Sequence, residues 1–200
     1  MKLHVIILAA GRASRFGSPK QLASIGNKSL INHCIDAYLA IQPQTLTVVT
    51  GCNSDEITHQ LPPQARALYC PSWEEGMGTS LSFAINNLPK PPGHVLIGLG
   101  DQIAITQDDL SGLINLSMQH PEHIISARYK GTLGVPALFP EKCIEQLSEL
   151  SGDTGAKHLI NSNQYPVIGL SMPNGAFDID SQDDLANWHR RCTQETTVDD

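Results

Sequence analysis

Short apolar runs alternate along the chain with longer segments whose apolar residues recur at helical spacing. The runs have the length of buried strands, and the longer segments carry the apolar stripe of amphipathic helices. Regular alternation of the two predicts a parallel sheet whose strands are joined by right-handed helical crossovers. Strands are predicted at 5–8, 45–51, 67–70, 95–99, 123–131 and 167–173, and helices at 29–41, 54–61, 79–88, 106–118, 152–160 and after 181.

The length of the chain fits a single domain. Two hundred residues can bury the core of one α/β domain but are too few for two independent domains. We therefore predict an α/β fold in one unit, with a mostly parallel sheet flanked by helices. We expect this domain to occupy residues 1–192 and the polar residues 193–200 to form a disordered tail.

Charge and cysteine content exclude several classes of protein. A formal net charge of −7 argues against general nucleic-acid binding, although Arg12, Arg15 and Lys20 form a local basic cluster. Five cysteines without a C-x-x-C pair argue against a disulfide framework or a zinc site. No apolar stretch reaches the length of a membrane span and no cleavable leader is recognisable, so we expect a cytoplasmic protein without a membrane partner.

The most informative stretch is L-A-A-G-R-A-S-R-F-G-S-P-K at residues 8–20. A strand followed by a basic glycine loop and a helix can close around negative charges at the end of a parallel strand. Gly11 permits close approach of a ligand, and Arg15 and Lys20 suit phosphate oxygens. Five residues separate Gly11 from Gly17, so this is not a Walker A loop, and G-x-G-x-x-G is absent. An ordinary solvated surface loop is the alternative.

Two later stretches also place polar residues at the end of a predicted strand or at the start of a predicted helix. The apolar run 95–99 leads into Asp101, whose carboxylate could hold magnesium opposite a phosphate loop or could simply cap the next turn. The string E-G-M-G-T-S-L at 75–81 places a Gly-x-Gly turn before Thr79 and Ser80. Capping of the following helix by these hydroxyls and binding of a polar ligand at the helix N-terminus are both consistent with this order.

The C-terminal third contains two more candidates. The string G-D-T-G-A-K allows Asp153 or Thr154 to cap a helix that carries Lys157 near its start. This is typical of a site for an acceptor phosphate and equally of an ordinary capped helix. Asp178 and Asp180 alternate with apolar neighbours, so they either share one face of a strand end or are surface charges.

Several motifs, which follow one another along nearly the whole chain, resemble those of the MobA-like nucleotidyltransferases. The loop L-A-A-G-x-x-x-R-x-G-x-x-K resembles the signature of this family, and E-G-M-G-T-S-L resembles its E-G-M-x-x-S-L element. The strings G-V-P-A-L-F, G-D-T-G-A-K and D-I-D resemble later family segments. Ile103 replaces a common proline, Lys157 replaces an arginine, and Ser181-Gln182 replace Thr-Pro. The resemblance implies a Rossmann-like fold of the glycosyltransferase-A type.

The resemblance also implies roles for individual residues. In the family the loop holds a nucleoside triphosphate, and the strand-end aspartate binds a metal ion. Arg15, Lys20 and Asp101 are thereby implied as catalytic residues and Mg²⁺ as the cofactor. Implied nucleotide-binding residues are Leu8, Ala9, Ala10, Gly11, Arg12, Arg15, Lys20, Gly76, Ser80 and Asp101; metal ligands are Asp101 with Asp178 or Asp180; acceptor-binding residues are Gly134, Pro136, Asp153, Gly155 and Lys157.

Within the family, L-A-A-G rather than L-A-G-G, together with G-D-T-G-A-K and D-I-D, is most similar to the molybdenum cofactor cytidylyltransferases. The implied reaction is attack by a terminal phosphate of molybdopterin on the α-phosphate of CTP, with release of pyrophosphate. CTP and a molybdopterin-type acceptor are the implied partners, with a molybdoenzyme or its chaperone as a candidate recipient. Use of GTP or another NTP, a sugar or alcohol phosphate acceptor, and a non-catalytic module that delivers a nucleotide or cofactor are the alternatives.

Overall fold

The computed structural model describes the backbone of residues 1–196 and the side chains of residues 1–191. A seven-stranded sheet with the order β5-β4-β1-β6-β8-β7-β9 forms its centre. Every strand except β8 runs in the same direction, so the predicted mostly parallel sheet is confirmed. The strands are β1 (Leu3–Leu8), β4 (Thr45–Thr50), β5 (Ala65–Tyr69), β6 (His94–Leu99), β7 (Ile124–Tyr129), β8 (Thr132–Phe139) and β9 (Val167–Ser171), and a separate ribbon pairs β2 (Ser24–Ile25) with β3 (Lys28–Ser29).

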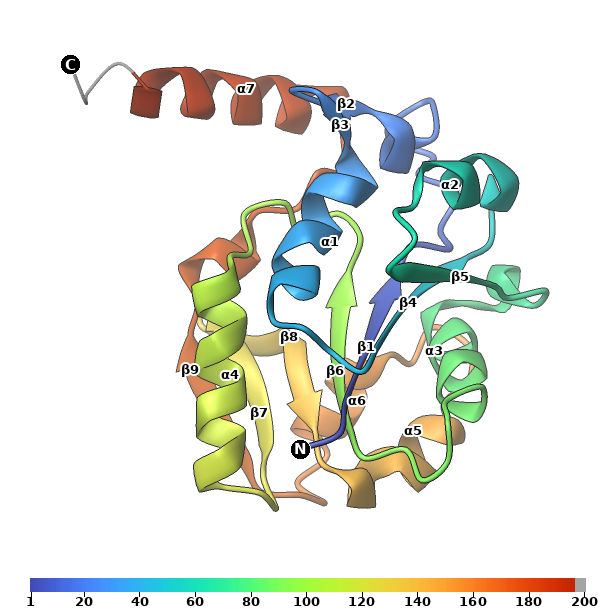
Figure 1. The fold of residues 1–200 in the computed structure, drawn as a ribbon, viewed down its shortest axis with the longest axis vertical. Coiled ribbons are helices and arrows are strands. Elements are labelled where there is room, and N and C mark those ends of the chain that lie inside the picture. The colour runs from blue at the N-terminus through green and yellow to red at the C-terminus, as the bar shows by residue number, and fades with distance from the viewer. Residues whose placement is uncertain (197–200) are drawn as a thin grey trace.

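Helices cover both faces of the sheet (Figure 1). The helices α1 and α4 pack on one face, and α3, α5 and α6 pack on the other. The helix α7 extends from the end of the molecule where the loop after β1 lies (Figure 1). The helices are α1 (Leu30–Ala40), α2 (Ser54–Gln60), α3 (Met77–Asn86), α4 (Gln107–Gln119), α5 (Ile144–Ser148), α6 (Ala156–Asn161) and α7 (Gln182–Thr196), with 3₁₀ turns at Lys20–Leu22, Trp73–Glu75, Glu141–Cys143 and Pro173–Ala176.

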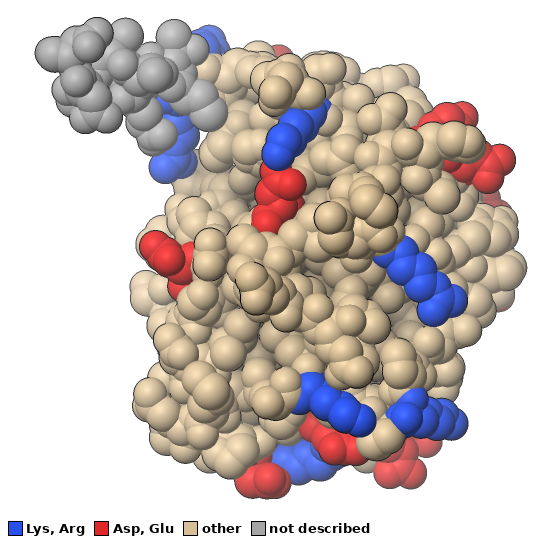
Figure 2. All heavy atoms as spheres, viewed as in Figure 1, with Lys and Arg blue, Asp and Glu red and all other residues tan. Residues whose placement is uncertain are grey.

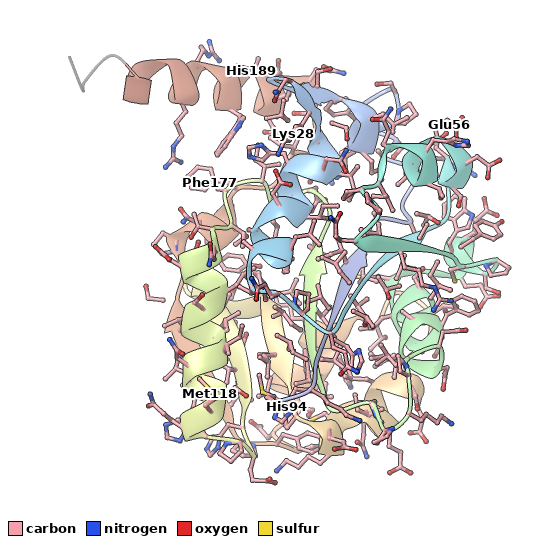
Figure 3. All side chains as sticks on the ribbon, viewed as in Figure 1. Lys28, Glu56, His94, Met118, Phe177 and His189 are labelled. Carbon is pink, nitrogen blue, oxygen red and sulfur yellow. The ribbon has the colours of Figure 1, made fainter. Side chains whose placement is uncertain are left out.

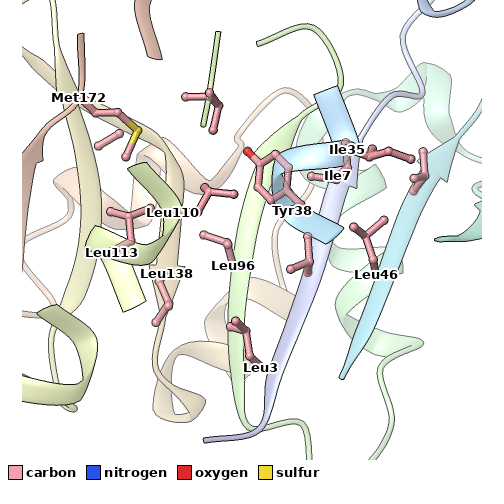
Figure 4. Close-up of a cluster of buried hydrophobic side chains, with 14 of the residues drawn as sticks. Leu3, Ile7, Ile35, Tyr38, Leu46, Leu96, Leu110, Leu113, Leu138 and Met172 are labelled. Carbon is pink, nitrogen blue, oxygen red and sulfur yellow. The ribbon is translucent and has the colours of Figure 1, made fainter. Parts of the chain in front are cut away.

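The apolar runs of the central strands are buried on both faces. Along β1, Val5 and Ile7 contribute to the core beneath α1 and α4, whereas Ile6 contributes to the core beneath α3. Figure 4 shows the first of these cores, in which Ile35 and Tyr38 of α1 lie against the sheet. Each of these five side chains is 0% exposed, which is expected for strands covered by helices on both faces.

The sheet topology determines where a ligand site can form. The strands β1 and β6 are adjacent and in register, with Leu8 opposite Leu99, so the loops that follow them leave the same edge. The chain order reverses between these two strands, because β1 connects towards β4 on one side and pairs with β6 on the other. In open α/β sheets, ligands bind outside the carboxyl ends of the strands at such a reversal.

Several element boundaries differ from the sequence-based expectation. The segment after β7, for which no strand is predicted, is the antiparallel strand β8, which contains the cis peptide bond Val135-Pro136. The helix α3 begins at Met77 with Gly76 at its N-cap, so Thr79 lies inside the helix and does not cap it. Of the expected tail 193–200, residues 193–196 continue α7, and 197–200 lie outside the described residues.

The surface shows no broad basic area on the face drawn in Figure 2, where Lys and Arg side chains are scattered singly or beside acidic ones. This agrees with the negative net charge of −7. Among the described helices, none has the length and apolar character that a membrane crossing requires.

Candidate active site

A partly buried lysine joins a loop near the start of the sequence to the segment before α7, at the carboxyl edge of the sheet. The Lys20 ammonium donates hydrogen bonds to Asp101 Oδ2 at 2.7 Å and to Asp180 Oδ1 at 2.9 Å. Arg15 donates to the other oxygen of Asp180 at 2.9 Å. Lys20 comes from the loop after β1, Asp101 from the end of β6, and Asp180 from the segment before α7. The sequence-predicted catalytic residues Arg15, Lys20 and Asp101 therefore meet in one cluster.

The surroundings of Lys20 keep it charged. Its side chain is 12% exposed, and burial by itself lowers the pKa of the ammonium. The charges and hydrogen bonds of Asp101 and Asp180 outweigh this effect, so the pKa of Lys20 is raised. At neutral pH the cluster thus holds a fixed positive charge between two carboxylates.

A cavity of about 420 Å³ opens over this cluster. Its lining contains the cations Arg15 and Lys20, against four acidic residues. A triphosphate is itself strongly anionic, so its entry into this cavity calls for additional positive charge. The lining residues are Leu8, Ala9, Ala10, Gly11, Ala13, Ser14, Arg15, Lys20, Gln21, Trp73, Glu74, Gly76, Met77, Ser80, Leu99, Gly100, Asp101, Asp153 and Asp180.

The loop after β1 is held by specific hydrogen bonds. The amide of Gln21, which is 3% exposed, donates to Ala9 O at 3.1 Å and to Gly11 O at 3.3 Å. The N–H of Ala9 donates to Val49 O at 2.9 Å, so the backbone groups that can face a ligand begin after Ala9. A Cβ at Gly11 would meet no atom within 4 Å, which means that Gly11 borders open cavity space.

The N-terminus of α3 is closed by a neighbouring segment of the protein. Gly78 N donates to Gly152 O at 2.7 Å, and the Thr79 hydroxyl accepts from Gly152 N at 3.0 Å. A Cβ at Gly78 would lie 2.4 Å from Thr154 O, so the glycine is required for this close approach. The contact brings Asp153 to the cavity wall.

Most of the chain matches a known protein family. Residues 5–167 match the model of the MobA-like NTP transferase domain. The chain belongs to this family. The bifunctional protein GlmU of Idiomarina loihiensis is 29% identical over 195 residues, which cover 94% of this chain and 40% of that relative. The MobA-like chain thus spans less than half of the length of that relative.

Solved structures share the fold of this MobA-like chain. A homologue of Mycobacterium tuberculosis Rv0371c from Mycobacterium sp. strain JC1 has a TM-score of 0.82 and 24% identity, covering 96% of this chain and 98% of that chain. Rv0371c itself, in complex with manganese, has a TM-score of 0.78 and 22% identity, covering 94% and 97%. The molybdopterin-guanine dinucleotide biosynthesis protein A of Archaeoglobus fulgidus has a TM-score of 0.69 and 14% identity, covering 96% and 99%.

Most residues predicted to bind nucleotide line the cavity of the MobA-like domain, but Arg12 does not. Arg12 donates to Glu74 Oε1 at 2.6 Å, and its guanidinium lies 5.6 Å from the centre of the Trp73 ring. Both Trp73 and Glu74 line the cavity. Arg12 therefore lies behind one wall of the cavity and supports it.

The residues predicted to bind an acceptor do not form one site. Asp153 lines the main cavity, whereas the other four lie outside its lining. Gly134 and Pro136 are buried in β8, where a Cβ at Gly134 would lie 2.8 Å from the Tyr129 hydroxyl. Gly155 and Lys157 lie at the start of α6. Of these two strings, only the G-D-T-G-A-K string reaches the main cavity, through Asp153, and the acceptor role of the five residues stays a prediction.

The predicted metal ligands Asp101, Asp178 and Asp180 occupy different positions around Lys20. Asp101 and Asp180 share Lys20, while Asp178 borders a second cavity. Burial first, and the charge of Asp101 second, raise the pKa of Asp178 to about 6. Asp101 Oδ1 is buried and has no hydrogen-bond partner among the described residues, which fits an oxygen available to a cation. The described residues include no group of three or more His, Cys, Asp or Glu side chains arranged to hold a metal ion.

Two positioning contacts could not be anticipated from the motifs. The Asp101 carbonyl accepts hydrogen bonds from Ile103 N at 3.1 Å and Ile179 N at 3.0 Å, which ties the segment before α7 to β6. A proline at position 103 could not donate this bond. The buried amide of Gln102 donates to Val135 O at 3.1 Å and Gly175 O at 3.0 Å. The bonds of Ile179 and Gln102 join distant segments, and the only sequence signal is the polar residue Gln102 in the loop after a buried strand.

Proposed function

We propose that the chain transfers CMP from CTP to a molybdopterin-type acceptor in a Mg²⁺-dependent reaction that releases pyrophosphate. The observation that carries the proposal is the position of Lys20 between Asp101 and Asp180 at the floor of the cavity. A fixed cation and two carboxylates beside a glycine loop suit a triphosphate and a divalent ion. The resemblance to the cytidylyltransferases supports CTP as the nucleotide.

The residues of the chain have separable roles in this proposal. Arg15, whose side chain is 78% exposed, can turn from Asp180 to the phosphates and neutralise them with its planar fork. Lys20 stabilises the negative charge that develops around the α-phosphate. The attacking phosphate of the acceptor is already an anion, so the reaction requires no side-chain nucleophile.

A magnesium ion fits the residues present. Asp101 and Asp180 would hold it together with phosphate oxygens of the substrate, because Mg²⁺ in such sites binds one or two carboxylates and substrate phosphates. When bound, the ion supplies positive charge to a cavity whose lining has two basic and four acidic residues. The manganese complex of Rv0371c supports a divalent ion in this fold.

A second candidate function is nucleotidyl transfer with another nucleotide or another acceptor. The similarity to a molybdopterin-guanine dinucleotide biosynthesis protein supports a molybdopterin-type acceptor but also a guanine nucleotide. A sugar or alcohol phosphate acceptor also stays open, because membership of the family does not determine the acceptor. A non-catalytic module that delivers a nucleotide or cofactor would not need Arg15, Lys20 and Asp101 in one cluster, and their presence favours the enzyme.

Calorimetric titration of CTP, GTP, ATP and UTP with Mg²⁺ tests the proposal. We expect CTP to bind most tightly, and Asp101→Asn to remove most of the metal-dependent part of its affinity. Asp36→Asn is the matched control, because Asp36 is a half-exposed aspartate paired with Lys28 and outside the cavity lining. Preference for GTP would reassign the nucleotide, and absence of binding by all four would contradict the proposal.

A further inference from the structure

A small third core lies at the end of the molecule that holds the charge cluster of Arg15, Lys20, Asp101 and Asp180. It is separate from the two larger cores, which lie between the sheet and the helices on its two faces. None of its buried side chains is more than 7% exposed. The buried members of this third core are Phe16, Ile25, Leu30, Cys34, Ile103 and Ile179, and Ala13, Ala23, Leu185 and Trp188 pack against them.

The third core and the charge cluster are built from the same three segments. In each segment an apolar side chain of the third core stands one or two positions from a charged residue of the cluster. The pairs are Arg15 with Phe16, Asp101 with Ile103, and Asp180 with Ile179. The carbonyl of Asp101 accepts hydrogen bonds from the N–H groups of Ile103 at 3.1 Å and Ile179 at 3.0 Å. Because a packed core leaves little freedom, its packing also fixes the spacing of the charged residues.

The loop that carries both cations is attached to this core by one side chain. Within residues 11–20, all of which the structure describes, Phe16 is the only buried residue, and it is 4% exposed. Its N–H donates to Ala13 O at 2.9 Å, and its carbonyl accepts from Gln182 Nε2 at 3.4 Å. Arg15, by contrast, has a side chain that is 78% exposed. The ring of Phe16 therefore holds the middle of the loop, while Arg15 reaches from the same stretch of backbone into the cavity.

A fixed loop binds a ligand more tightly than a mobile one. A loop that samples many conformations loses that freedom when a ligand orders it, and this loss weakens binding. A loop that is already held in the binding conformation avoids most of the loss. The phenyl ring of Phe16 has no group that could bind a phosphate, so any effect on phosphate binding passes through Arg15 and Lys20.

We propose that Phe16 is a positioning residue, whose ring in the third core holds the backbone from which Arg15 and Lys20 reach the phosphates of the nucleotide. Ile103 and Ile179 hold the two carboxylate segments against the same core. The consequence for binding rests on the proposed nucleotidyl transfer, whereas the anchoring of the loop is tested without a nucleotide.

Limited digestion with trypsin tests the anchor. Arg12 in the loop and Arg66 in β5 are both exposed arginines, but cleavage in a strand of the sheet requires much wider unfolding than cleavage in a loop. We expect Phe16→Leu to accelerate cleavage after Arg12 about tenfold, since a smaller side chain packs less well in the third core. Cleavage after Arg66 should change much less.

Phe139→Leu is the matched control. Phe139 is 0% exposed, belongs to the core beneath α3, and lies opposite Val95 in the pairing of β8 with β6. His94, the residue before Val95, lies at the opposite end of the molecule from His189 of α7 (Figure 3). A general loss of stability would appear in both variants and at both cleavage sites, whereas a loosened loop appears only in Phe16→Leu and only after Arg12.

Calorimetry then links the anchor to the nucleotide. At a temperature at which circular dichroism shows every variant to be folded, Phe16→Leu should bind CTP with Mg²⁺ about tenfold more weakly than the wild type. Phe139→Leu should bind it as the wild type does. Phe16→Met keeps more of the side-chain volume, so it should restore most of the affinity and most of the resistance to trypsin.

The outcomes separate this inference from the proposed function. Unchanged cleavage after Arg12 in Phe16→Leu overturns the anchor. Faster cleavage without a change in CTP affinity, or equal losses of affinity in Phe16→Leu and Phe139→Leu, overturns the positioning role. If the wild type binds no CTP, nucleotidyl transfer is contradicted and the positioning role falls with it, while the digestion still decides whether Phe16 anchors the loop.

Discussion

Replacement of Lys20 with methionine removes a charge but keeps most of the side-chain volume. Lys20 donates two hydrogen bonds to carboxylates, of 2.7 Å and 2.9 Å. The bond to Asp101 joins side chains that are 12% and 21% exposed, so solvent screens it little. The bond to Asp180 contributes less, because Asp180 is 40% exposed and retains Arg15. A buried hydrogen bond to a charged group contributes about 1.5–3 kcal/mol, and we expect Lys20→Met to lower the unfolding free energy by about 2–3 kcal/mol.

Urea denaturation and thermal unfolding measure this loss. For a chain of this size, about 2–3 kcal/mol corresponds to a decrease in Tm of about 5–10 °C. Burial lowers the pKa of Lys20, but Asp101 and Asp180 raise it further, so the pKa is raised in the folded state. The contribution of Lys20 is then fully present at neutral pH and is lost only as the pH rises through this raised pKa. The difference between the two proteins should therefore be present at neutral pH and decrease at alkaline pH, where the Lys20 ammonium loses its proton.

A metal titration sharpens the prediction. In Lys20→Met the two carboxylates lose the ammonium between them, so Mg²⁺ without nucleotide should stabilise the variant more than the wild type. Lys28→Met is the control: Lys28 also pairs with an aspartate, Asp36, but its side chain is 48% exposed, and the loss should stay below about 1 kcal/mol. Equal losses in Lys20→Met and Lys28→Met, or equal stabilisation of all three proteins by Mg²⁺, would refute the reasoning.

Three further predictions concern the loop after β1, the start of α3 and the last helix. Gly11→Ala should leave the Tm unchanged, since its Cβ meets open space, but should weaken nucleotide binding in calorimetry. Gly78→Ala, by contrast, should lower the unfolding free energy measured in urea by about 1–3 kcal/mol, because its Cβ would lie 2.4 Å from a carbonyl oxygen. Similar stability of Gly11→Ala and Gly78→Ala would contradict this prediction. Ser181→Ala removes a helix cap and should cost about 1 kcal/mol at pH 7. The Ser181 hydrogen bond is the main cause of the lowered pKa of Asp184. The stability that this pair contributes is therefore present at neutral pH and is lost as the pH falls through the pKa of Asp184. If the urea midpoints of the wild type and Ser181→Ala differed by the same amount at every pH, this prediction would be wrong.

The framework of the fold could be predicted from the sequence because it depends on local patterns. Apolar runs buried on both faces and helices with one apolar stripe identify a layered α/β domain without any knowledge of distant contacts. The meeting of the basic loop with Asp101 was predictable for the same reason: both follow parallel strands, whose carboxyl ends share an edge. The cap of α4 is also local, since Thr106 and Asp109 bond each other three residues apart.

Features that depend on distant contacts could not be predicted in this way. The strand β8 contains Pro136, which weakens the strand signal, and its antiparallel pairing with β6 is set by tertiary packing. The glycines before α3 suggested a ligand site, yet Gly78 is required because Gly152 and its neighbours pack against the helix. The sequence pattern does not show that Asp180 borders both cavities whereas Asp178 borders only the second, because their positions follow from the hydrogen bond between Ile179 and Asp101.

The ion pairs of Lys20 and Arg15 with Asp180 span 160 and 165 positions of the chain. In a nascent chain, β1, β4, β5 and β6 can pair before the residues that follow them have been synthesised. At that stage Lys20 has only Asp101 as its acidic partner. Contacts of such separation form late, since a long loop must close before they do. Chains interrupted before residue 180 would therefore resemble a folded sheet with an incomplete charge cluster. Synthesis itself thus orders the events: the framework comes first, and the charge cluster is completed only when residue 180 has been added.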